Sequence, residues 1–143
     1  MDRTPSIRTG WLKLLYVYTL LGAGGTGLLI LFTPQSFMQF FSMPATEPYF
    51  FGAVGSVFLA FAVVAALGLR SPLTFAPMLL VQLLYKIAWF AFVFIPRLLQ
   101  GSIPFYGWFV AAVFLSYIIL DVIAIPFRWV FSNKAAVTGW VTG

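Results

Sequence analysis

The sequence contains no cysteine and no histidine, and it has few charged residues. Without cysteine the chain cannot form a disulfide, supply a thiolate nucleophile or ligate an iron–sulfur cluster. Without histidine it lacks the usual axial ligand of haem and the commonest ligand of zinc and copper. The only acidic residues, Asp2, Glu47 and Asp121, are too few for a carboxylate metal cage. We therefore predict no metal site and no cofactor of the chain's own.

Charged residues make up only 8% of the 143 residues, and hydrophobic residues make up 62%. About a quarter of the residues in a soluble domain are charged, so lipid is the expected solvent for this chain. The net charge of +5 does not indicate nucleic-acid binding, because the lysines and arginines are scattered rather than clustered. We predict a single membrane domain over residues 1–143.

Four hydrophobic stretches approach or exceed the ~20 residues that a helix needs to cross a bilayer. They are residues 11–32, 49–69, 75–95 and 105–125. Hydrophobic and polar residues do not alternate with a period of two, so the sequence does not indicate a transmembrane β-barrel. The predicted fold is all-α and polytopic, with four transmembrane helices in an antiparallel bundle. Pro96 is expected to end the third span, and the tight connection Arg70–Pro72 makes spans two and three antiparallel neighbours.

The first loop contains an amphipathic segment at residues 34–42. Pro34 suits the first turn of a helix, and Phe37, Phe40 and Phe41 share one helical face. We interpret the segment as a short helix lying in the membrane interface. A plain aromatic-rich loop is the alternative.

Basic residues predict the orientation of the chain. One side of the membrane would hold Arg3, Arg8, Lys13, Arg70, Arg128 and Lys134. The other side would hold only Arg97, since Lys86 lies within a span. This bias predicts a multi-pass protein with both termini in the cytoplasm. Residues 132–143 are expected to form a flexible tail.

Small residues in the first two spans are candidates for close helix packing, which drives helix association in lipid. They are Gly22, Gly24, Gly25, Gly27, Gly52, Gly55 and Ser56. They form either a seam within the bundle or a surface that docks another subunit.

Two ionisable residues lie inside predicted spans, where charge is costly and usually functional. Lys86 is near the middle of the third span and shares a stripe with Gln82, Trp89 and Val93. Asp121 lies near the end of the fourth span, one turn after Tyr117. Lys86 would be ~10 Å deeper in the membrane than Asp121 at helical rise. A direct ion pair would therefore be strained, and Tyr117 or a water molecule could bridge the gap.

Three interpretations of these residues remain open. Lys86 and Asp121 could lock the packing of the bundle. Gln82, Lys86, Trp89, Tyr117 and Asp121 could instead line a polar pocket for a lipid, a quinone or another amphiphile headgroup. The third interpretation is catalysis, with Lys86 as a Schiff-base lysine or part of a proton relay. No sharp motif supports a catalytic residue, and we assign none.

Several stretches between residues 10 and 128 resemble the DoxX-like class of small bacterial four-helix membrane proteins. They are the glycine-rich first span, residues 32–37 leading to Met43-Pro44, Gly52-x-x-Gly55, residues 66–69, and residues 81–89. The resemblance implies accessory roles, such as a subunit of a quinone-linked oxidoreductase complex or an assembly factor. With the absence of organellar targeting signals, it implies a bacterial inner membrane.

Two functional hypotheses follow. The first is a non-catalytic accessory subunit or assembly factor of a larger membrane complex, with membrane lipids and other membrane subunits as partners. The second is a membrane protein that binds an amphiphile, or a DoxX-like oxidoreductase component, with a polar site around Lys86. The sequence leaves open whether the protein is an enzyme.

Overall fold

The computed structural model describes residues 8–132 and is all-helical over this range. In chain order its helices are α1 (Thr9–Phe32), α2 (Pro34–Phe40), α3 (Pro48–Arg70), α4 (Ala76–Trp89), the π-helical turn η1 (Phe90–Phe94), α5 (Ile95–Leu99), α6 (Phe105–Ala124) and α7 (Phe127–Val130). Since α4, η1 and α5 are continuous, four helices are long and apolar enough to cross a membrane. The predicted fold class is confirmed. Arg3, Lys134 and the predicted tail from residue 133 lie outside the described residues.

Local signals in the first loop explain where its helices begin. Pro34 and Pro48 occupy the first turns of α2 and α3, where a missing N–H costs nothing. The Glu47 carboxylate accepts hydrogen bonds from the backbone N–H groups of Tyr49, at 2.9 Å, and Phe50, at 2.8 Å. This N-cap satisfies donors that would otherwise be unpaired at the membrane surface. Glu47 is thus a structural residue of the loop.

The prediction that Pro96 ends the third span is wrong, because the helix continues to Leu99. In a regular α-helix the proline ring would collide with the carbonyl group four residues earlier. Here the preceding turn widens into a π-helix, in which the Ile95 N–H donates to the Phe90 carbonyl. This wider turn is a recognised way of accommodating an irregularity within a helix.

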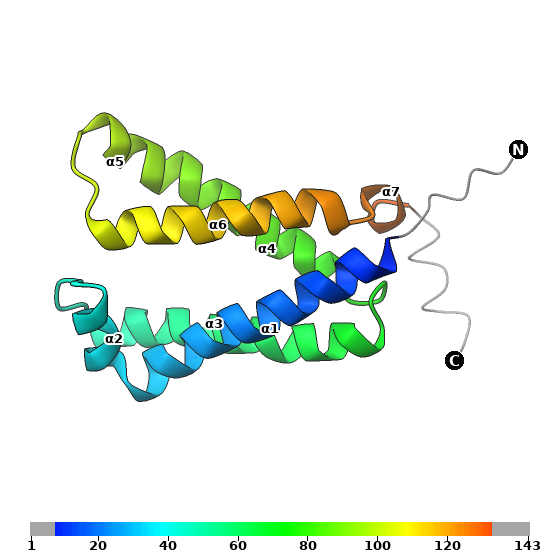
Figure 1. Ribbon diagram of the computed structural model, residues 1–143, viewed down its shortest axis with the longest axis horizontal. Coiled ribbons are helices and arrows are strands. Elements are labelled where there is room, and N and C mark those ends of the chain that lie inside the picture. The colour runs from blue at the N-terminus through cyan, green and yellow to red at the C-terminus, as the bar shows by residue number, and fades with distance from the viewer. Residues whose placement is uncertain (1–7, 133–143) are drawn as a thin grey trace, which may run out of the picture.

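The bundle consists of two helix pairs that converge at one end and diverge at the other (Figure 1). The α1–α3 contact is the most extensive, and α4 packs mainly on α6. We call the end where α1 begins and α6 ends the terminal end, and the end with α2 and α5 the distal end. Helices α3 and α4 are antiparallel, as predicted, but their contact is sparse. They turn away from one another after the short connection, so the prediction of close neighbours holds only there.

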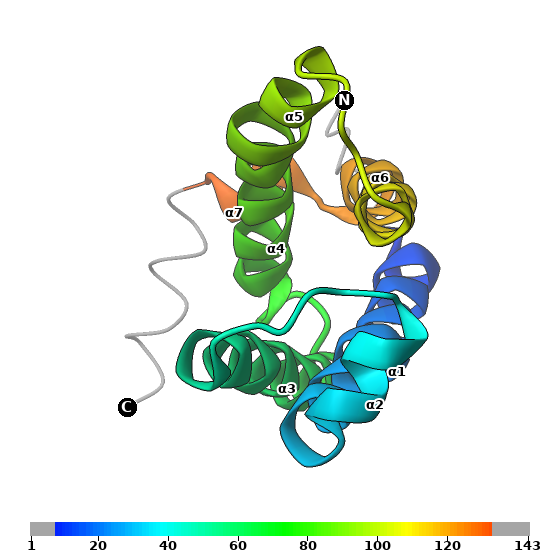
Figure 2. The same ribbon diagram turned by 90° about the vertical axis from the view of Figure 1, so that its left-hand side faces the viewer.

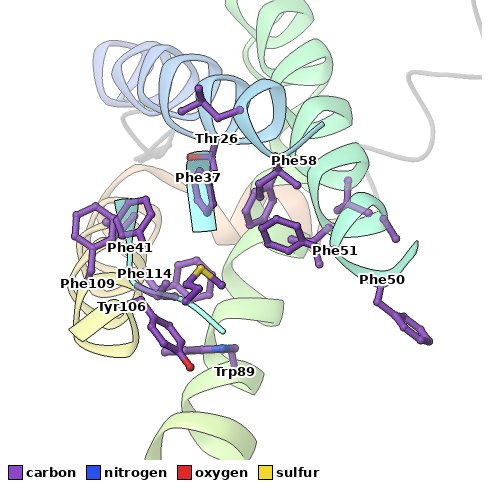
Figure 3. A pocket seen from close by; sticks show the side chains of 18 of the residues that line it. Thr26, Phe37, Phe41, Phe50, Phe51, Phe58, Trp89, Tyr106, Phe109 and Phe114 are labelled. Atoms are coloured by element: carbon purple, nitrogen blue, oxygen red, sulfur yellow. The ribbon is translucent and has the colours of Figure 1, made fainter. Parts of the chain in front are cut away.

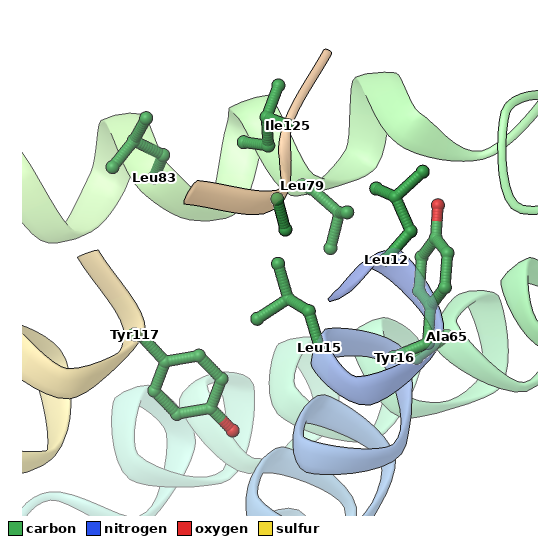
Figure 4. Packing of buried hydrophobic residues seen from close by; sticks show 9 residues of the cluster. Leu12, Leu15, Tyr16, Ala65, Leu79, Leu83, Tyr117 and Ile125 are labelled. Atoms are coloured by element: carbon green, nitrogen blue, oxygen red, sulfur yellow. The ribbon is translucent and has the colours of Figure 1, made fainter. Parts of the chain in front are cut away.

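The terminal half of the bundle is tightly packed (Figure 4). A cluster of buried side chains joins α1, α3, α4, α6 and the segment after α6; it comprises Leu12, Leu15, Tyr16, Ala65, Leu79, Leu83, Tyr117, Ala124 and Ile125. The Tyr16 hydroxyl donates to the Pro72 carbonyl at 2.7 Å. This bond fixes the α3–α4 connection against α1.

Part of the predicted small-residue set forms the α1–α3 interface. A Cβ atom at Gly27 would lie 2.8 Å from the Gly55 carbonyl oxygen, and one at Gly24 would lie 3.0 Å from the Ala62 Cβ. A Cβ at Gly22 would collide with the Tyr117 hydroxyl, so that glycine faces α6.

The other predicted packing residues are not part of the seam within the bundle, and a surface that docks another subunit stays a prediction for them. A Cβ at Gly25 or Gly52 would meet nothing within 4 Å. Ser56 is exposed, and its hydroxyl donates to the Gly52 carbonyl of its own helix at 2.9 Å. The reason is geometric: Gly25 and Gly52 lie on sides of their helices turned away from the partner helix.

Helix α2 lies across the distal end, where the chain that follows it crosses toward α3 (Figure 2). The predicted aromatic face is present, but part of it packs on the protein. The ring of Phe37 lies 6.0 Å from that of Phe51 on α3, and the ring of Phe41 lies 4.9 Å from that of Phe109 on α6. Phe40 remains exposed. Helix α2 thus connects the two diverging helix pairs.

Candidate functional site

A buried polar cluster lies between the packed terminal half and the open distal half of the bundle. Four predicted site residues belong to it: Gln82 and Lys86 on α4, and Tyr117 and Asp121 on α6. Thr19 of α1, which sequence reasoning missed, is the fifth member. All five side chains are almost completely excluded from the surface.

Lys86 is held mainly by aromatic rings. Its Nζ atom lies 4.3 Å from the centroid of the Tyr117 ring, 4.5 Å from that of Tyr85 and 5.7 Å from that of Phe114. Its hydrogen bond to the Gln82 carbonyl oxygen is long, at 3.4 Å. Cation–π attraction therefore replaces much of the hydration that the ammonium group loses on burial.

Asp121 is completely buried, and neither carboxylate oxygen accepts a hydrogen bond from any described residue. Its charge interacts with that of Lys86, and Gln82 is a polar neighbour. Neither of these side chains, nor any other donor in the described range, reaches hydrogen-bonding geometry with the carboxylate. The predicted strain of a direct pair with Lys86 agrees with this arrangement, in which the ammonium group lies over the Tyr117 ring instead.

The remaining polar contacts join α1 to α4 and α6. The side chains of Thr19 and Gln82 contact one another at 3.3 Å. The Tyr117 hydroxyl donates to the Tyr18 carbonyl at 3.1 Å. The Tyr18 ring lies against that of Tyr117, with centroids 4.3 Å apart. The Tyr18 hydroxyl bonds Ser116 Oγ at 2.8 Å. These contacts hold three helices together at the level of Lys86.

Trp89, the fifth predicted site residue, is not part of this cluster. It lies in the wall of a large cavity in the distal half, together with Val93 (Figure 3). The volume of the cavity is about 1250 Å³. The cavity opens where the two helix pairs diverge. The predicted stripe along α4 therefore begins in the polar cluster at Lys86 and ends at Trp89 and Val93 in an apolar space.

Aromatic side chains dominate the cavity wall and come from every membrane-length helix except α1. They are Phe37, Phe40 and Phe41 of the α2 region, Phe50, Phe51 and Phe58 of α3, Tyr85, Trp89 and Phe92 of the third span, and Tyr106, Phe109 and Phe114 of α6. Helix α1 contributes Thr26, Leu29 and Ile30. No lysine, arginine, aspartate or glutamate is among the described residues that line the cavity.

Tyr85 and Phe114 connect the cavity with the polar cluster, because both line the cavity and both contact Lys86 through their ring faces. Sequence reasoning missed them. On a helix, Tyr85 is rotated by about 100° from Lys86, so it falls outside the polar stripe. The signal that could have indicated Tyr85 is that it is an aromatic residue directly next to an intramembrane lysine.

The described residues contain no group of three or more potential metal ligands. Comparison of the chain with known protein families, curated proteins and solved structures finds no match. The geometry of the cavity and of the polar cluster is therefore the basis for assigning a function.

Proposed function

We propose that this membrane protein binds an uncharged amphiphile in the distal cavity. The observation that carries the proposal is a space of about 1250 Å³, walled by aromatic and aliphatic side chains, in the distal half of a membrane bundle. Binding pockets are typically apolar clefts with a few polar groups. Here the polar groups of the wall are the hydroxyls of Thr26, Thr33, Ser36, Tyr85 and Tyr106 and the Trp89 indole N–H.

The character of the wall selects the class of ligand. A phospholipid would bring a charged phosphate, which arginine or lysine side chains normally bind, and the described wall has neither. A molecule with an apolar body and one small neutral polar group suits the hydroxyls better. An isoprenoid quinone and a neutral lipid share this chemistry.

The test is to identify what the protein carries from its membrane. The chain would be purified in mild detergent, and the bound molecules extracted and measured by mass spectrometry. Ala88→Phe places a bulky ring in the cavity and obstructs it, since Ala88 lines it. Ala60→Phe is the matched control, because Ala60 is an exposed helical alanine that is not part of the wall.

We expect a neutral amphiphile in stoichiometric amount with the wild-type chain and with Ala60→Phe, and a loss of at least tenfold with Ala88→Phe. A quinone would show its ring absorbance, whereas a neutral lipid would not. Equal amounts of every extracted molecule in the two variants would contradict the proposal.

An accessory subunit of a larger membrane complex is the second candidate. The exposed face of α3 favours it, because Gly52, Ser56 and Ala60 recur there at intervals of four residues, a pattern that permits close helix approach in lipid. Mild extraction followed by protein mass spectrometry tests it. A specific partner should be lost on Ser56→Leu, and a monomer with no co-purifying protein argues against it.

We further propose that the protein belongs to the DoxX-like class and resides in a bacterial inner membrane with both termini in the cytoplasm. The distribution of basic residues supports this orientation. Arg8, Lys13, Arg70 and Arg128 lie at the terminal end, whereas Arg97 lies at the distal end. By the positive-inside tendency the terminal end faces the cytoplasm, and the cavity opens toward the opposite leaflet.

A further inference from the structure

Tyr85 occupies a position that no other tyrosine of the described chain shares. It lines the cavity, and its ring lies 4.5 Å from the buried ammonium group of Lys86. The rings of Phe61, at 5.6 Å, and Phe114, at 5.8 Å, support it from two sides. The side chain is therefore held in place at the inner limit of the cavity.

The Tyr85 hydroxyl is a hydrogen-bond donor without a partner in the described part of the chain. The side-chain hydrogen bonds near it involve Tyr18, Thr19, Gln82, Ser116 and Tyr117 instead. A hydroxyl group in an apolar wall gains free energy when it is paired. An oxygen acceptor on a ligand in the cavity can supply that partner.

The ammonium group of Lys86 makes this donor stronger. A cation over a phenol ring attracts the ring electrons and thereby increases the positive charge on the hydroxyl hydrogen. Asp121, which is 0% exposed and has no hydrogen-bond donor among the described residues, offsets the charge of Lys86. This opposite charge stabilises the ammonium group of Lys86 inside the membrane, although Lys86 itself does not line the cavity.

We infer that Tyr85 donates a hydrogen bond to a carbonyl or ether oxygen of the ligand, and that Lys86 is a positioning residue that acts through the Tyr85 ring. The inference rests on the proposed function and names the polar group that the ligand must carry. Tyr85 would thus distinguish an amphiphile with an oxygen acceptor from a pure hydrocarbon.

Trp89 provides the measurement, because it lines the cavity and can be made the only tryptophan. The other tryptophans, Trp11, Trp108, Trp129 and Trp140, are replaced by phenylalanine. Quenching of Trp89 fluorescence is then titrated with two probes, a brominated long-chain ketone and the brominated alkane of the same length. The Ala88→Phe variant gives the quenching that occurs without access to the cavity.

We expect Tyr85→Phe to weaken ketone binding about tenfold and to leave alkane binding unchanged. Unchanged alkane binding also shows that the variant is folded. Tyr49→Phe is the matched control, since Tyr49 is an exposed tyrosine that is not part of the cavity wall. It should leave the preference for the ketone intact.

The role of Lys86 is tested in both backgrounds. Lys86→Met should reduce the preference for the ketone about threefold when Tyr85 is present, and it should have no effect on that preference in Tyr85→Phe. The same preference in wild type and Tyr85→Phe would overturn the inference while the proposed function stands. If neither probe quenches wild-type Trp89 beyond the Ala88→Phe background, the proposed function itself fails.

Discussion

At the scale of single residues, the main question is how a bilayer protein keeps Lys86 and Asp121 away from water. Lys86 is 1% exposed and Asp121 is 0% exposed. Aromatic faces surround the ammonium group, and the Gln82 carbonyl accepts the one long hydrogen bond that it makes within residues 8–132. Each ion therefore depends on the charge of the other more than on hydrogen bonds, because the carboxylate has no donor among the described residues.

This dependence predicts a non-additive effect of removing the two charges. Lys86→Met should lower the free energy of unfolding by about 3 kcal/mol, since it leaves Asp121 buried without a counter-charge. Asp121→Asn should have a smaller effect of the same sign. The double variant should be more stable than Lys86→Met alone. Unfolding in mixed micelles monitored by circular dichroism measures all three.

Gln82→Leu is a useful control for that cycle, because it changes a buried polar residue of the same cluster without removing a charge. The effect of Gln82→Leu on the free energy of unfolding should combine with that of Lys86→Met in a different way from how it combines with that of Asp121→Asn. Strict additivity of Lys86→Met and Asp121→Asn would show that the two charges do not interact in the membrane, contrary to the prediction.

The residue scale also shows what the sequence could reveal. Lys86, Asp121, Gln82 and Tyr117 were predictable as one site, because polar groups within apolar spans have to face the interior of a bundle. Trp89 was assigned to the same stripe, yet it lies in the cavity wall. The change of environment along the stripe depends on how far α4 diverges from α3, which no local pattern encodes.

At the scale of helices, the α1–α3 pair depends on close backbone approach at Gly27. A Cβ there would lie 2.8 Å from both the Gly55 carbonyl oxygen and the Leu59 nitrogen. These are backbone atoms that cannot move aside singly. Gly27→Ala should therefore destabilise the protein by about 1–3 kcal/mol through forced separation of the helices.

Gly25→Ala is the matched control for this change, because a Cβ at Gly25 meets nothing within 4 Å and alanine favours the helix. It should leave stability unchanged or raise it slightly. Thermal unfolding of the two variants in the same detergent makes the comparison. Equal losses would indicate that helix geometry, and not the α1–α3 contact, determines the effect.

Helix α2 and the residue after it line the cavity mainly with aromatic side chains, namely Phe37, Phe40 and Phe41. Phe41 reaches α6 at Phe109, with ring centroids 4.9 Å apart. Cysteines at positions 41 and 109 would be the only thiols of the chain. Linking them with a short bismaleimide should slow the release of a cavity ligand at least tenfold.

The control for α2 is the same pair of cysteines without the cross-linker, which should release ligand at least as fast as the wild type because the Phe41–Phe109 contact is lost. Release can be followed by recovery of Trp89 fluorescence after dilution of a brominated probe. Cross-linked protein that exchanges ligand as fast as the free form would show that the cavity opens between helices and not beneath α2.

Helix positions were largely predictable because the length of a bilayer crossing and the turn-forming prolines constrain them. The span predicted at residues 49–69 appears as Pro48–Arg70, and that at 105–125 as Phe105–Ala124. The third span was predicted too short, because Pro96 is accommodated by the π-helical turn before it. Such a turn accommodates the proline through its backbone hydrogen bonds, so the pattern of side chains gives no sign of it.

At the scale of the whole molecule, the packed core at the terminal end and the cavity at the distal end form one arrangement. The Tyr16 hydrogen bond and the surrounding aliphatic residues hold the helix pairs together at one end. Their divergence then leaves the distal half open and lined with aromatic residues. The buried polar cluster lies at the boundary between the halves, where a ligand polar group can reach Tyr85.

The two ends of the bundle are predicted to face opposite sides of the membrane, with the terminal end in the cytoplasm and the cavity toward the other leaflet. Because the chain has no native cysteine, Ser71→Cys in the α3–α4 connection and Ser102→Cys in the loop before α6 each introduce a single thiol. Both sites lie outside the long helices, at opposite ends of the bundle. An impermeant maleimide added to intact cells should label Cys at position 102 at least tenfold more than at position 71, and permeabilised cells should label both.

The reverse pattern would place the terminal end outside, against the distribution of basic residues. Equal labelling of both positions in intact cells would mean that the two ends share one compartment, which four membrane crossings do not allow.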